Sequence, residues 1–123
     1  MNYLGVQGIV HTASIVSFSP DPNLVIPQTI SGVTSLLDSA AKELSVKSFV
    51  YTSSSVAAIG GGPNENLSLD ESSWNNAQIK EAWSVIAEPF PATHPFAVYG
   101  ASKAEAELAC KLNKLSYTRN QRR

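Results

Sequence analysis

The sequence predicts an α/β fold in which two parallel strands are joined by a helix. Residues 8–14 and 48–53 are short, uncharged and rich in β-branched side chains, which is typical of strands buried on both faces of a parallel sheet. Between them, apolar residues recur at spacings of three and four, as on one face of a helix. Strand, helix and strand in this order form a βαβ unit, for which we expect a right-handed crossover.

The joining helix is predicted to begin near Pro27, after residues 19–22, where two prolines leave little room for regular structure. A proline in the first turn is tolerated because its missing N–H would have no partner there. Gly32 costs about 1 kcal/mol relative to alanine inside a helix, so we expect it to allow a close approach to another segment. The apolar face comprises Ile26, Ile30, Val33, Leu37, Ala40, Ala41 and Leu44.

Two further helices are predicted in the C-terminal half. The first spans residues 70–85 and carries Trp74 and Trp83. Three prolines then predict an irregular stretch. The second helix spans residues 97–115, where Ala, Glu, Lys and Leu give high helix propensity. Residues 116–123 are polar and basic, and we expect this tail to be disordered.

Length and composition narrow the class of protein. A chain of 123 residues corresponds to one domain, and 43% hydrophobic residues suffice for a core. Nine basic and ten acidic side chains give a net charge of -1, which argues against a nucleic acid partner. The single cysteine, Cys110, excludes a disulfide framework and a cysteine-based zinc site, and we predict no metal site. We expect a cytoplasmic protein, because the chain shows neither a membrane-length apolar run nor a secretory signal.

The string Tyr99-Gly-Ala-Ser-Lys103 is the first candidate for chemistry. Residues four apart share one face of a helix, so the phenol and the ammonium are neighbours. A nearby cation favours the phenolate, which would make Tyr99 a usable general acid for a carbonyl being reduced. The same spacing also occurs in helix pairs that have no catalytic role, so the pair alone leaves both interpretations open.

Ser54 strengthens the catalytic interpretation. It follows the second predicted strand, at the edge where open α/β sheets place their ligands. A hydroxyl at that edge can hydrogen-bond a substrate carbonyl while Tyr99 protonates it. The alternative is that the run of hydroxyl residues at positions 52–55 only satisfies backbone groups where the strand ends.

Four motifs in order along the chain resemble the extended short-chain dehydrogenase/reductase family. Within it, the chain is most similar to the dihydroflavonol reductase-like and fungal aldehyde/ketone reductases. The matching stretches are Gly-Ile-Val-His-Thr-Ala-Ser at 8–14, Phe-Val-Tyr-Thr-Ser-Ser at 49–54, Leu-Asp-Glu-Ser-Ser-Trp-Asn at 69–75 and Val-Tyr-Gly-Ala-Ser-Lys-Ala-Glu-Ala-Glu at 98–107. The resemblance implies a partial Rossmann-like fragment of a doubly wound parallel sheet over residues 1–115, consisting of the βαβ unit and the active-site helix.

The resemblance also assigns roles to single residues. Ser54, Tyr99 and Lys103 would form the catalytic triad, and His11 would pack within the first strand. Lys103 would also bind the nicotinamide ribose, while residues after the first strand would pass the pyrophosphate and its adjoining ribose. Residues after the second strand would lie along the nicotinamide. The implied cofactor contacts are Ala13, Ser14, Thr52, Ser53, Tyr99 and Lys103.

The function implied by the resemblance is reduction of a small-molecule aldehyde or ketone to an alcohol, with NADP as the expected cofactor and NAD as the alternative. Two other interpretations stay open. The chain would be a non-catalytic truncated product, or a fragment that associates with a full-length homologue. Within the family, it would instead act as a sugar-nucleotide epimerase or dehydratase, or resemble a 3β-hydroxysteroid dehydrogenase.

One family feature is not found in the 123 residues. The family binds pyrophosphate with a Gly-x-x-Gly-x-x-Gly turn at the start of a helix, and no such turn precedes Gly8. The three glycines at 60–62 do not replace it, because Pro-Asn-Glu follows them and no helical run begins there. We therefore expect these residues alone to bind the cofactor weakly. A sheet of only two strands would also leave one side of each strand without a hydrogen-bonded neighbour.

Overall fold

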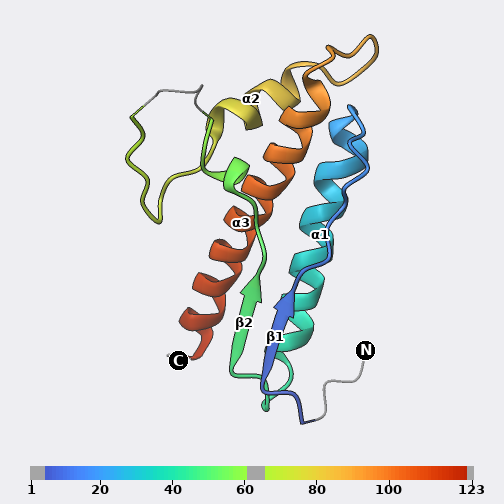
Figure 1. The fold of residues 1–123 in the computed structure, drawn as a ribbon. Helices are drawn as coiled ribbons and strands as arrows, with labels where there is room; N and C mark the ends of the chain where they lie inside the picture. The colour runs from blue at the N-terminus through green and yellow to red at the C-terminus, as the bar shows by residue number, and fades with distance from the viewer. Residues whose placement is uncertain (1–4, 61–65, 122–123) are drawn as a thin grey trace.

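In its described residues the chain forms two strands, three helices and one short 3-10 turn. The structure is a computed structural model that describes residues 5–60 and 66–121, with side chains described as far as Asn113. In chain order the elements are β1 (Gly8–His11), α1 (Pro22–Ala41), β2 (Ser48–Tyr51), the 3-10 turn η1 (Ser55–Ala57), α2 (Asn76–Ser84) and α3 (His94–Gln121) (Figure 1). Residues 61–63 of the predicted glycine loop lie outside the described residues.

The two strands form a parallel sheet, as predicted. β1 pairs with β2 in a register that sets Ile9 opposite Phe49 and His11 opposite Tyr51. α1 joins the two strands, and α1 and α3 run alongside them (Figure 1). The predicted fold class, a partial α/β Rossmann-like fragment built on a βαβ unit, is confirmed.

The prediction that both strands are buried on both faces is wrong. Side chains on one face are half-buried, whereas Val10 and Val50 on the other face are 65% and 53% exposed. The apolar runs at 8–14 and 48–53 are those of a sheet covered on both sides, but within residues 5–60 and 66–121 nothing covers the second face. Both strands are also shorter than predicted, because the bond from the Thr52 N–H to the His11 carbonyl (2.9 Å) ends the ladder.

α1 begins at Pro22, five residues before the predicted start. The Asp21 carboxylate caps the helix by accepting the N–H of Asn23 at 2.9 Å, and Pro22 occupies the first turn. Pro27 lies inside the helix, so the argument that its missing N–H is harmless applies to Pro22 instead. The helix ends at Ala41, which leaves Leu44 beyond it and 85% exposed.

The core lies where α1 and α2 pack against α3. From the predicted apolar face of α1, Ile26 and Val33 are fully buried. On α3 most of the buried hydrophobic residues are alanines, whose small side chains allow the neighbouring helices to approach closely. The buried cluster consists of Val25, Ile26, Ala82, Ala97, Val98 and Ala101. No helix in the described ranges is long and apolar enough to cross a membrane.

α2 is shorter than the predicted helix over residues 70–85. Asp70 forms a turn instead, because its carboxylate accepts the N–H and the hydroxyl of Ser72 at 2.8 and 2.7 Å. The helix begins at Asn76 after the cap residue Asn75, so Trp74 precedes it. Trp83 lies within the helix and joins it to α3 by donating its indole N–H to Glu105 at 3.1 Å.

α3 is longer than the predicted helix over residues 97–115. It begins at His94 and continues to Gln121, because no glycine or proline follows Gly100 to interrupt it. Residues 116–121 are therefore helical rather than irregular, contrary to the expected disordered tail, and residues 122–123 lie outside the described part of the chain.

Gly32 also differs from expectation, and the difference predicts a stabilising substitution. A Cβ at Gly32 would meet nothing within 4 Å, so the glycine serves no close approach. We expect Gly32→Ala to raise the free energy of unfolding by about 0.5–1 kcal/mol, because alanine loses less backbone entropy in a helix. Urea denaturation followed by circular dichroism measures this.

Gly100→Ala is the matched control for this substitution. Gly100 is also helical, but a Cβ there would collide with the side-chain amide of Gln78. We expect Gly100→Ala to raise the free energy of unfolding less than Gly32→Ala does, or to lower it. A lower free energy of unfolding in Gly32→Ala would contradict the prediction.

Candidate active site

α3 brings a buried lysine to the carboxyl end of β2. Lys103 is 3% exposed, and its ammonium donates a hydrogen bond to the Thr52 carbonyl oxygen at 3.3 Å. Tyr99 precedes it by one helical turn and is half-buried. Two of the residues singled out in the sequence therefore lie beside the end of the strand that carries Ser54.

Burial governs the charge state of Lys103. Desolvation lowers the pKa of its ammonium below the usual lysine value, and the nearby Glu107 carboxylate acts in the opposite direction. Within the described residues no carboxylate forms an ion pair with this ammonium, so the Thr52 carbonyl is its one hydrogen-bond acceptor. The ammonium thus has further N–H groups that can donate hydrogen bonds to a hydroxyl placed near it.

The Ser54 hydroxyl is not used to cap the backbone. Ser54 stands at the N-terminal cap position of η1, where its carbonyl accepts the Ala57 N–H at 3.0 Å. Its side chain makes no cap hydrogen bond. The alternative that this serine only satisfies the end of the strand therefore has no support from its side chain. Among the described residues, no hydrogen bond joins the hydroxyls of Ser54 and Tyr99 either.

The residues implied for the cofactor lie together at the carboxyl ends of the two strands. Ala13 and Ser14 follow β1, Thr52 follows β2, and all three are exposed. The Ser53 hydroxyl is buried and has no hydrogen-bond partner. The carboxyl ends of neighbouring parallel strands are where open α/β sheets bind dinucleotides, and the residues gathered here fit such a place. Nothing in the 123 residues has the pattern that binds a pyrophosphate.

Two aromatic residues beside these strand ends were not singled out from the sequence. The Lys103 ammonium lies over the Tyr51 ring, 5.3 Å from its centroid. Phe18 lies against Tyr99, with ring centroids 5.6 Å apart, and has a φ of 50°, in the left-handed region that glycine favours. The inward position of Tyr51 on its strand was a usable signal. Phe18 had none, because its contact with Tyr99 joins segments far apart in the sequence.

His11 packs, in line with the interpretation from the sequence. It is half-buried, and its ring stacks on Tyr51 at 5.7 Å with an interplanar angle of 28°.

Asn75 fixes the segment that follows Ser54. It is 3% exposed and donates from its side-chain amide to the carbonyls of Val56 (2.9 Å) and Ile59 (2.8 Å). Its side-chain oxygen accepts the Gln78 N–H at 3.1 Å and so caps α2. One side chain thus ties the turn after the serine to the helix that packs on α3. The sequence placed Asn75 in a family motif but assigned it no role.

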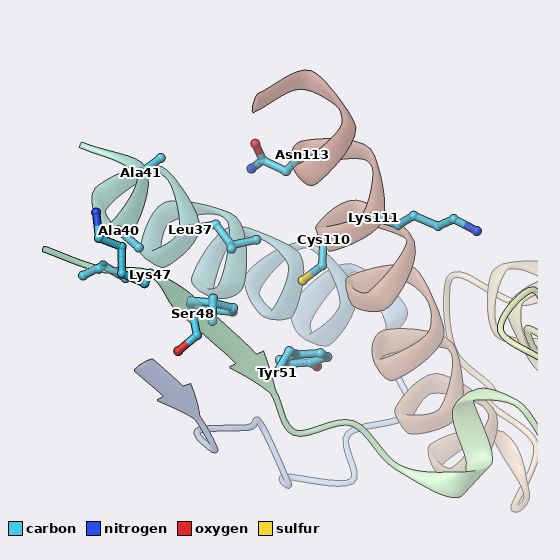
Figure 2. A pocket seen from close by; sticks show the side chains of 11 residues that line it. Leu37, Ala40, Ala41, Lys47, Ser48, Tyr51, Cys110, Lys111 and Asn113 are labelled. Carbon is cyan, nitrogen blue, oxygen red and sulfur yellow. The ribbon is translucent and has the colours of Figure 1, made fainter. Parts of the chain in front are cut away.

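The structure also contains a cavity that Tyr51 lines, although Ser54, Tyr99 and Lys103 do not. It has a volume of about 370 Å³ and lies between α1, β2 and α3, with Leu37, Phe49 and Cys110 among its lining residues (Figure 2). Figure 2 shows Tyr51 and Cys110 projecting into it from β2 and α3. Burial raises the pKa of Tyr51 to about 12 and that of Cys110 to about 11.

Curated proteins share this stretch of chain, although no protein-family profile matches it. The chain is 41% identical over 102 residues, 83% of its length, to an NAD-dependent epimerase/dehydratase of Aspergillus terreus. It is 45% identical over 106 residues, 85% of its length, to aldehyde reductase 2 of Sporidiobolus salmonicolor. Over 77 residues, 61% of its length, it is 35% identical to vestitone reductase of Medicago sativa. The chain spans 29%, 30% and 23% of these relatives, respectively.

The parallel βαβ unit followed by the long helix that carries Tyr99 and Lys103 is part of an α/β Rossmann-like domain. With these relatives, the chain belongs to the extended short-chain dehydrogenase/reductase family over the stretch that they share.

The contacts of Asn75 predict a large loss of stability on its removal. Asn75→Ala deletes the cap of α2 and leaves the Val56 and Ile59 carbonyls without this partner, so we expect the free energy of unfolding to fall by about 2–3 kcal/mol. Asn76→Ala is the control, because Asn76 is exposed at the first position of the same helix. Equal urea midpoints for both variants would refute this role of Asn75.

The raised pKa of Cys110 predicts slow alkylation of its thiol. The thiolate is the reactive form, so with a pKa of about 11 only a small fraction reacts near neutral pH. We expect iodoacetamide to react at least about 100-fold more slowly with the folded chain than with the chain in urea. The rate should keep rising with pH up to about 11. A plateau near pH 9 in the folded chain would show that burial does not control this thiol.

Proposed function

We propose that this chain carries the proton-donating part of a carbonyl reductase site, which acts on a small-molecule aldehyde or ketone. The observation that carries the proposal is the buried Lys103 ammonium, held at the carboxyl end of β2 one helical turn from Tyr99. Two relatives named aldehyde reductase and ketoreductase support carbonyl compounds as the substrate class.

Each residue of the proposed triad has a distinct task. Tyr99 donates its phenolic proton to the carbonyl oxygen as that oxygen gains negative charge. Lys103 lies one turn away, and its ammonium stabilises the phenolate that remains. Ser54 donates a hydrogen bond to the same carbonyl oxygen and so orients the carbonyl group. The nicotinamide, when bound, supplies the hydride to the carbonyl carbon.

The carboxyl ends of the two strands would hold the cofactor. We propose NADP as this cofactor, with NAD as the alternative. Lys103 would hydrogen-bond the nicotinamide ribose, and Ser53, whose hydroxyl is buried without a partner, would lie along the nicotinamide. Thr52 would lie along the nicotinamide, and Ala13 and Ser14 would border the pyrophosphate. We expect weak binding by these 123 residues alone, since they contain no Gly-x-x-Gly-x-x-Gly turn. One unpaired cysteine supports a reducing compartment such as the cytoplasm.

A second candidate function is association with another chain of the same family. Its supporting observation is the open face of the sheet, on which Val10 and Val50 are 65% and 53% exposed. The sheet has two strands, so the outer edge of each is also unpaired within the described chain. In this role residues 1–115 would act as a partial NAD(P)-binding domain completed by a full-length homologue. The relative named epimerase/dehydratase keeps epimerisation and dehydration as alternative reactions within the family.

Substitution of the triad tests the proposed reduction. We expect the chain to oxidise NADPH in the presence of an aromatic aldehyde, and Tyr99→Phe to slow this by at least about 100-fold, because the proton donor is removed. The dissociation constant for NADPH should stay within about twofold, since the phenol acts on the substrate. Absorbance of NADPH measures the rate, and fluorescence titration measures the binding.

Neighbouring serines provide the control. Ser54→Ala should slow the reaction, whereas Ser55→Ala, at an exposed position next to it, should not. Full turnover in Tyr99→Phe would remove this residue from the mechanism. Absence both of turnover and of saturable NADPH binding up to about 1 mM would favour the association role instead.

A further inference from the structure

The ammonium of Lys103 has few partners for a buried charge. Lys103 is 3% exposed and carries three N–H donors, yet within residues 5–60 and 66–113 only the Thr52 carbonyl accepts one of them, at 3.3 Å. That distance is long for an N–H···O bond. Among the described residues no carboxylate lies within ion-pair distance, and the Glu107 carboxylate acts on the ammonium only from farther away. A further group must therefore help to hold this charge in place.

The Tyr51 ring is that group. The Lys103 ammonium lies over it, 5.3 Å from the ring centroid, which is within the range of a cation–π contact. The contact joins two elements far apart in the sequence, because Tyr51 ends β2 and Lys103 lies in the middle of α3. The negative face of the Tyr51 ring thus stabilises the ammonium, which has few hydrogen-bond acceptors around it.

The ring of Tyr51 is itself held in place by the sheet. Tyr51 points toward the helices, and the ring of His11, its register partner on β1, stacks on it at 5.7 Å. The Tyr51 hydroxyl is buried and has no hydrogen-bond partner. The hydroxyl therefore anchors nothing, and the ring face is the part of the side chain that acts on Lys103.

We propose that Tyr51 is a positioning residue, whose ring face fixes the Lys103 ammonium against the Thr52 carbonyl. The inference rests on the proposed function in one respect: the ammonium so placed is the one that stabilises the Tyr99 phenolate. The catalytic residue is Lys103, and Tyr51 acts through it. Burial lowers the pKa of the ammonium, and the ring face opposes this by favouring the charged form.

Nuclear magnetic resonance of the 123-residue chain tests the contact without cofactor or substrate. Protons of Lys103 next to the ammonium should resonate upfield of those of exposed Lys80, because the Tyr51 ring shields them. Tyr51→Phe should keep the upfield shift, since it removes only the unpaired hydroxyl. Tyr51→Leu should abolish it and lower the pKa of Lys103. Lys111 is the internal control, because its ammonium lies 4.5 Å from the Trp74 ring centroid and should stay shielded in every variant.

A fluorinated series separates the ring charge from packing and remains informative if Tyr51→Leu fails to fold. Phenylalanine analogues with one and three ring fluorines at position 51 keep the size of the ring and weaken its negative face. We expect the pKa of Lys103 to fall stepwise with the number of fluorines. A pKa that does not change along the series, or an upfield shift that survives in Tyr51→Leu, would overturn the proposal. These readouts need no turnover, so they stand apart from failure of the reductase assay.

Discussion

The arrangement of this molecule depends on burying one charged group, the Lys103 ammonium, where α3 crosses the end of β2. A buried cation must be satisfied, and here the Thr52 carbonyl and the Tyr51 ring do so. These contacts attach α3 to the sheet at one point and set the height of Tyr99 one turn away. They lie at the carboxyl end of β2, which is why we place the candidate site there.

Small side chains make this attachment possible. α3 meets α1 and α2 through Ala97 and Ala101, so the helix axes can approach and the lysine stem can be covered. Gly100 leaves room for the Gln78 side chain from α2. Asn75 then ties α2 to the turn after Ser54. The serine, the tyrosine and the lysine are therefore supported by one connected set of contacts rather than by separate loops.

One face of the sheet packs against the helices, and the opposite face is open. Val10 and Val50 belong to runs with the composition of a strand covered on both faces, yet more than half of each side chain is exposed. The chain spans less than a third of the relatives named above. Helices cover both faces of a doubly wound parallel sheet, whereas one face and the outer strand edges are open in the described part of this chain.

Local chemistry was sufficient to predict much of this protein. Two uncharged runs rich in β-branched residues, with helical spacing between them, predicted the βαβ unit. The Tyr-x-x-x-Lys string placed Tyr99 and Lys103 on one helix face, and both predictions depend only on neighbours along the chain. The ends of the helices were predicted poorly. The helix caps are Asp21 and Asn75, and nearby residues of similar type could have capped the helices equally well. Only the tertiary structure decided that one sheet face is open, that Phe18 takes a left-handed backbone conformation, and that Tyr51 lies under Lys103. Each of these depends on segments far apart in sequence meeting in space, and no local pattern encodes such a meeting.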